Sequence, residues 1–316
     1  MTQPTDAPGF DALKQQLDTL LAQAHANMPP PPEAIGCLTD LRRMHHRTPW
    51  HALLVQRDIG GGKTATADLL AGLQAQPQAT ALTVSGLNQA ALEALCANAR
   101  RLTAIHFWKC PRLEDLSPLQ DMPQLEYVAF YWNQRATRLW DFRKTPSLRG
   151  LCFEDFSRLG KLDDLACATS LAELDFGNAI HAKFQPETLE PLSSLTSLQS
   201  LCFNAKSIRD GRIQALGSLV ALTEFATSKR LFNAEQLAWL RARLPQVKSD
   251  VLAPFTRLKQ TLTIKGRKLD VIVNGKGKPL LSSDVDAAKL ARHVAEFDAM
   301  VRRFTDDPSL EPKAMA

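Results

Sequence analysis

The sequence lacks any apolar run near 18 residues, the length from which a segment is considered a membrane-spanning helix. Residues 1–6 provide neither the basic start nor the apolar stretch of a cleaved signal peptide. We therefore expect no membrane insertion and no cleaved leader. The setting that fits best is cytoplasmic, and the alternative is an effector secreted without a cleaved signal peptide.

Paired cysteines are also missing. None of the six cysteines forms a Cys-x-x-Cys pair or has the spacing of a zinc site. His45, His46 and His51 have no cysteine or acidic residue at ligand spacing, so we expect no metal site and no cofactor. Reduced thiols agree with a cytoplasmic setting.

The sequence has little excess charge of one sign. Lysine and arginine total 38 against 33 acidic residues, which gives a net charge of +5. This value is too small to indicate nucleic-acid binding, and we expect no nucleic-acid partner. Hydrophobic residues make up 45% and charged residues 22%, so the chain is globular rather than disordered.

What the sequence does contain is a repeat. The pattern Leu-x-x-Leu-x-Phe recurs at intervals of about 23 residues. Its copies start at Leu102, Leu125, Leu148, Leu171, Leu198 and Leu222. A degenerate first copy starts at Ala79, and a degenerate last copy at Leu244. A fixed period of this length is typical of a solenoid, in which each repeat buries its apolar side against its neighbours.

The remainder of each repeat has an apolar residue at every third position, most clearly over 113–125 and 189–201. A period of three predicts 3₁₀ turns, because side chains at i and i+3 eclipse there. Here the chain resembles the internalin-like class of short leucine-rich repeats, whose turn often reads Asp-Leu-Ser-Pro-Leu, as at 115–119. The resemblance covers roughly 79–247. It implies an α/β leucine-rich repeat solenoid, a horseshoe of seven or eight repeats.

Two departures from that class stand out. Its asparagine at the ninth slot of the repeat is kept only as Asn133. Internalins are exported and anchored at the bacterial surface, and this chain shows neither signal. The composition, rich in alanine, glutamine and proline, is typical of a bacterium with a high-GC genome.

The segments outside the repeats predict caps for the two ends of the solenoid. Helical periodicity over 10–28 precedes four consecutive prolines, and the alternating runs 261–265 and 269–273 predict a hairpin before a helix over 287–304. The predicted divisions are 1–33, a helix and proline linker; 34–78, an N-terminal cap that starts with a short basic helix over 34–49; 79–250, the repeats; 251–304, a C-terminal cap; and 305–316, a loose tail.

Side chains alternate along a strand, so slots three, five and seven of each copy face the concave side, with slot eight at its edge. Both tyrosines of the chain fall in these slots, beside tryptophans and an acidic group. Exposed tyrosine and tryptophan often anchor interfaces. The predicted partner-binding residues are His106, Trp108, Lys109, Tyr127, Tyr131, Trp132, Glu154, Asp155, Glu173 and Asp175. The alternative is that the aromatics pack on one another or under the N-terminal segment, and that the acidic group is a solvated face.

The function predicted from this surface is protein–protein recognition, as an adaptor, a toxin-neutralising partner or an effector. The partner is a protein or peptide with an apolar or basic anchor. No catalytic motif stands out, so we expect no enzyme activity. The alternative is an enzyme that uses the Gly60–Thr64 loop to bind a nucleotide or phosphate. This loop lacks the first glycine of the phosphate-binding pattern, where Arg57 stands, and favours a tight turn.

Overall fold

A computed structural model of the chain describes residues 32–178 and 183–315. The chain forms two units, Met1–Glu33 and Ala34–Ala316, and all elements below belong to the second. The helix predicted over 10–28 lies outside the described residues.

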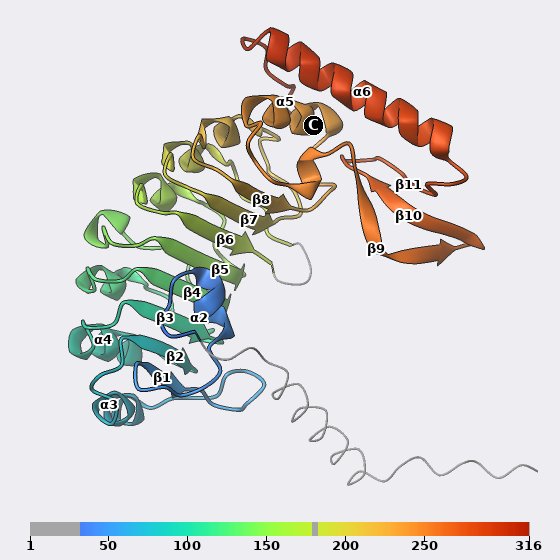
Figure 1. Ribbon diagram of the computed structural model, residues 1–316. Helices are drawn as coiled ribbons and strands as arrows, with labels where there is room; N and C mark the ends of the chain where they lie inside the picture. The colour runs from blue at the N-terminus through green and yellow to red at the C-terminus, as the bar shows by residue number, and fades with distance from the viewer. Residues whose placement is uncertain (1–31, 179–182, 316) are drawn as a thin grey trace, which may run out of the picture. The chain divides into compact units, whose positions relative to one another are not determined.

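One parallel sheet runs through the repeats, with its strands in chain order (Figure 1). The strands are β1 (His51–Leu54), β2 (Ala81–Ser85), β3 (Ala104–Trp108), β4 (Tyr127–Asn133), β5 (Gly150–Phe156), β6 (Glu173–Gly177), β7 (Ser200–Asn204) and β8 (Glu224–Thr227). A single parallel bridge between Glu224 and Lys248 marks the degenerate last copy. The predicted leucine-rich repeat solenoid is confirmed.

Helices and 3₁₀ turns cover one face of this sheet (Figure 1). The 3₁₀ turns predicted from the period of three are confirmed. The elements are α3 (Thr66–Gln74), α4 (Gln89–Asn98), η1 (Ser117–Asp121), η2 (Phe142–Lys144), η3 (Asp163–Cys167), η4 (Glu190–Ser194), η5 (Gln214–Ser218) and α5 (Ala234–Arg243). The opposite face of the sheet is called the concave face below.

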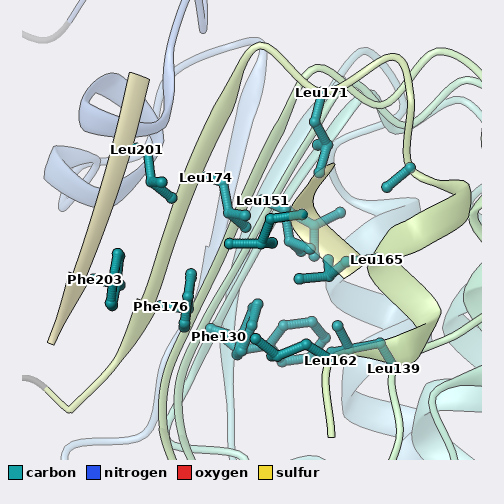
Figure 2. Close-up of a cluster of buried hydrophobic side chains, with 14 of the residues drawn as sticks. Phe130, Leu139, Leu151, Leu162, Leu165, Leu171, Leu174, Phe176, Leu201 and Phe203 are labelled. Atoms are coloured by element: carbon teal, nitrogen blue, oxygen red, sulfur yellow. The ribbon is translucent and has the colours of Figure 1, made fainter. Parts of the chain in front are cut away.

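The hydrophobic core lies between the sheet and this outer layer (Figure 2). Phenylalanines of the sixth slot face one another across neighbouring strands, for example Phe153 with Phe176 and Phe176 with Phe203. Their rings stack with centroids 5.3 Å and 5.0 Å apart. Each ring is buried because the repeat on either side supplies its cover.

Beyond the repeats lie η6 (Asp250–Leu252), an antiparallel sheet of β9 (Phe255–Ile264), β10 (Arg267–Val273) and β11 (Leu280–Leu281), and the helix α6 (Ala287–Asp306). The predicted hairpin forms, and it turns through Lys265 and Gly266, which both have positive φ, as two-residue hairpin turns favour. α6 packs against α5, with Phe297 and Phe304 buried.

The last residues follow α6 back to the repeats. The sequence predicted a loose tail here, and in the structure the backbone of Met315 donates to the carbonyl of Gly211 over 2.9 Å. The indole of Trp239 donates to the carbonyl of Leu310 over 3.2 Å. These contacts place residues 310–315 beside the outer layer of the final repeats.

Candidate functional site on the concave face

The concave face carries its own small apolar cluster, separate from the main core. The short helix α2 (Leu38–Arg43) lies on this face against β3, β4 and β5 (Figure 1). Its apolar side chains pack on small concave residues and on one tyrosine. The buried members of the cluster are Leu38, Leu41, Ala81, Ala104, Tyr127, Ala129 and Cys152.

Backbone groups near α2 add polar contacts to this packing. The Tyr127 hydroxyl donates to the carbonyl of Gly36 over 2.7 Å, and the amide of Leu38 donates to Glu173 over 3.1 Å. We expected residues 34–78 to cap the end of the solenoid. Part of that segment, α2, instead crosses the concave face, while β1 extends the sheet.

Arg42 binds two carboxylates of the predicted acidic group. Its Nη1 donates to Asp175 over 2.7 Å and its Nη2 to Glu154 over 2.9 Å. Burial raises the pKa of both carboxyl groups, and the guanidinium works against that rise. Glu154 and Asp175 are therefore paired within the chain. Asp155 lies apart from them and accepts from the side-chain amide of Asn178 over 2.8 Å.

His106 is buried on the same face, with 4% of its surface exposed. Burial lowers its pKa to about 3, and the charges of Arg42, His45 and His51 add to that lowering. Its ring meets Trp108 edge-on, with centroids 5.9 Å apart. A neutral imidazole in this position is a packing group under ordinary conditions.

The remaining predicted aromatics lie at the rim where the strands end. Trp108 and Tyr131 stack with ring centroids 4.6 Å apart and planes 19° from parallel. The Lys109 ammonium lies 5.3 Å from the centre of the Trp108 ring and donates to the carbonyl of Ile59 over 2.8 Å. We call Trp108, Lys109, Tyr131 and Trp132 the aromatic rim; all four are partly exposed.

Slot eight has a left-handed backbone in the first four copies of the repeat. Lys109, Trp132 and Asp155 have φ of 51°, 63° and 57°, and Gly86 occupies the same slot of the first copy with φ of 67°. Side chains other than glycine rarely adopt this conformation. Gly86 and Lys109 directly follow the last residues of β2 and β3, whereas Trp132 and Asp155 are the next-to-last residues of β4 and β5. Gly86 is the sequence signal from which this turn could have been predicted.

A pocket of about 690 Å³ opens beside the rim. It combines aromatic surface with more cations than carboxylates. Its lining includes Lys109, Tyr131, Trp132, Asp155, Phe156, Arg158, Leu159, Phe184 and Arg209. A second hollow of about 570 Å³ lies on β7 and β8, where Cys202, Glu224 and Ala226 are exposed. The concave face is thus covered by α2 over β3–β5 and open over β7 and β8.

The structure divides the predicted site into two groups of four residues and two residues that lie outside them. Tyr127, Glu154, Glu173 and Asp175 contact the α2 segment. The residues of the aromatic rim meet at the strand ends. His106 is buried between these groups, and Asp155 borders the pocket. The short helix predicted over 34–49 forms as α2. The sequence did not predict its place on the concave face, although Leu38, Leu41 and Arg42 carry the apolar and basic anchors that were assigned to an external partner.

The Gly60–Thr64 loop packs against the turn after β2. The Thr64 hydroxyl donates to the carbonyl of Ser85 over 2.7 Å, and a side chain at Gly86 would meet the carbonyls of Gly61 and Gly62 at 2.6 Å. The threonine that coordinates a nucleotide-bound magnesium ion in a phosphate-binding loop is thus engaged with backbone. These contacts give the loop a role in packing.

Residues 32–178 and 183–315 contain no group of three histidine, cysteine or acidic residues that could hold a metal ion. Within the same ranges, no helix has the length and apolar character needed to cross a membrane.

No family model matches the chain, and no curated protein does. Among solved structures it is similar to two internalins of Listeria monocytogenes. Internalin C2 is 20% identical over 52% of this chain and 77% of that chain, with a TM-score of 0.39. The internalin InlF is 15% identical over 75% of this chain and 79% of that chain, with a TM-score of 0.41. Toll, from the Drosophila Toll–Spatzle complex, is 17% identical over 63% of this chain and 30% of that chain, with a TM-score of 0.37. These similarities assign no partner to this chain.

Proposed function

We propose that this leucine-rich repeat chain recognises a protein or peptide partner on its concave face, and that the aromatic rim anchors that partner. The observation that carries the proposal is the stacked pair Trp108–Tyr131, which remains partly exposed at the rim. Tryptophan and tyrosine bury large areas with few rotatable bonds, and they dominate the energetics of many interfaces.

The surroundings of the rim favour an extended contact. The pocket beside it offers apolar walls from Trp132, Leu159 and Phe184, with Arg158 and Arg209 as hydrogen-bond donors. The open surface of β7 and β8 continues the same face. A partner that places an apolar side chain on the rim could extend along either surface.

The test is affinity capture from a lysate of the source organism. The wild-type chain is compared with a Trp108→Ala, Tyr131→Ala, Trp132→Ala variant of verified fold. The control variant carries Val220→Ala and Leu262→Ala, which removes exposed apolar side chains elsewhere; these are 68% and 44% exposed. We expect a partner that the wild type and the control retain and the rim variant loses.

Retention of the same partner by the rim variant would contradict the proposal. If none of the three chains retains a partner, the effector setting is favoured over a resident adaptor or toxin-neutralising role. Capture is then repeated with lysates of cells that an effector would enter.

A further inference from the structure

We propose that the concave surface of β3–β6 is a recognition site for a short helix with two leucines three residues apart followed directly by an arginine, and that α2 is its resident intramolecular occupant. A partner presenting such a helix displaces α2 and takes its place. This inference rests on the proposed function, because it specifies the partner and the regulation of the same face.

The apolar half of the site has a shape fitted to leucine. Under α2 the concave slots of neighbouring strands hold Ala104, Ala129 and Cys152, which let a helix approach the sheet closely. At Gly150 an added Cβ would lie 2.9 Å from the Leu38 side chain and 2.5 Å from the Tyr127 ring. The glycine therefore leaves room for Leu38. Leu38 and Leu41 are both buried, so the surface selects apolar side chains at i and i+3.

The polar half of the site requires a cation. Glu154 and Asp175 lie on neighbouring strands and both bind the guanidinium of Arg42. Without that charge, two partly buried carboxylates would face each other, which is unfavourable. Arginine suits this position because its planar group donates in two directions at once. A competing helix must bring a cation to the same place.

The resident helix is weakly formed by itself. α2 has six residues, and its N-cap residue Cys37 makes no side-chain capping bond. Helices this short do not persist in water without tertiary contacts. The Arg42 side chain is 37% exposed, so solvent and salt screen its ion pairs. Polar anchoring of this kind fixes the register of the helix more than it stabilises the fold.

The test uses a labelled peptide of residues 34–47 and two full-length chains. One chain is wild type; the other carries Leu38→Ser and Leu41→Ser, which loosens α2 and leaves the concave face unchanged. We expect the peptide to bind the double-serine chain at least about tenfold more tightly, because an occupant present more than about 90% of the time reduces apparent affinity by that factor. Arg42→Ala gives a milder second receptor, with an intermediate affinity expected.

Two peptide variants distinguish specific binding of Arg42 by the two carboxylates from a nonspecific attraction between a basic peptide and an acidic surface. Arg42→Glu places a carboxylate against Glu154 and Asp175. Arg43→Glu makes the same charge change at the next residue, which is exposed. We expect the first to bind at least about tenfold more weakly than the unmodified peptide and the second to bind within about twofold of it. A receptor with Glu154→Lys and Asp175→Lys added to the double-serine background should prefer the Arg42→Glu peptide.

The proposal is overturned if the folded double-serine and Arg42→Ala chains both fail to bind the peptide, or bind it no better than the wild type. It is also overturned if the two charge-reversed peptides bind equally. The assay contains only purified chain and peptide, so its failure leaves the capture experiment on the aromatic rim unaffected. Conversely, Lys109→Ala and Trp132→Ala should leave peptide affinity within about twofold, since neither residue belongs to the α2 cluster. Tyr131 is kept in this control because it lies beside Glu154 on the neighbouring strand.

Discussion

On the concave face, the region of β3–β5 and the region of β7 and β8 use the same slots of the repeat and differ in what covers them. Cys152 on β5 and Cys202 on β7 both stand in slot five, with Asp175 on the strand between them. Cys152 is 1% exposed because α2 lies over it, whereas Cys202 is exposed. Burial on this face is therefore decided by a segment from elsewhere in the chain, and the repeat pattern alone does not determine it.

The same hydrophobic core lies beneath the covered and the open strands. A substitution in this core should therefore destabilise both regions together. Phe153→Ala deletes one ring of the stack and leaves a cavity under β5. We expect a loss of about 3–5 kcal/mol in unfolding free energy, measured by urea denaturation. A loss under about 1 kcal/mol would show that neighbouring repeats collapse into the space.

Gly150→Ala should expose the covered region. The added methyl group collides with Tyr127 and Leu38, so we expect α2 to be displaced and the unfolding free energy to fall by about 2–3 kcal/mol. Gly160→Ala is the matched control, because a Cβ there meets nothing within 4 Å. Equal stability of the two variants would mean that α2 accommodates the methyl group without leaving.

The architecture was predictable because the repeat is periodic. The spacing of Leu102, Leu125 and Leu148 determines the strand register, and the period of three predicts the 3₁₀ turns. The short helix over 34–49 was also predictable, but its position on the concave face was not, since Leu38 contacts Glu173, 135 residues away. From the sequence we predicted that the acidic group binds a basic side chain. We did not predict that this side chain is Arg42 of the same chain.

The covered region should also be more sensitive to acid. The pKa of His106 is about 3 in the folded chain and about 6.5 when unfolded, so only the unfolded chain takes up a proton between these values. The contribution of neutral, buried His106 to the unfolding free energy is fully present above pH 6.5 and declines as the pH falls toward 3. In His106→Gln we expect the decline between pH 7 and pH 5 to be smaller by up to about 2 kcal/mol. Parallel curves for the two chains would contradict this burial.

Arg42→Ala should have the smallest effect on global stability. The side chain is partly solvated, so we expect about 1 kcal/mol, and less in 1 M salt. Arg143→Ala serves as the control, because its pair with Asp141 is local and more exposed. A loss of several kcal/mol in the Arg42 variant would make α2 an integral part of the fold and not a displaceable occupant.

Reversible coverage of the concave face by α2 is tested most directly by the alkylation rate of Cys152 relative to that of Cys202. Mass spectrometry follows both rates in the wild type and in Arg42→Ala. Removal from solvent, which is only partial at Cys202, and the neighbouring Asp175 carboxylate raise the pKa of both thiols, so slow reaction is expected at neutral pH and the comparison is made at one alkaline pH. We predict that Cys202 reacts in both chains, while Cys152 is protected in the wild type and reacts at least about tenfold faster in the variant. Equal protection of Cys152 in the two chains would contradict the claim that α2 covers the concave face reversibly.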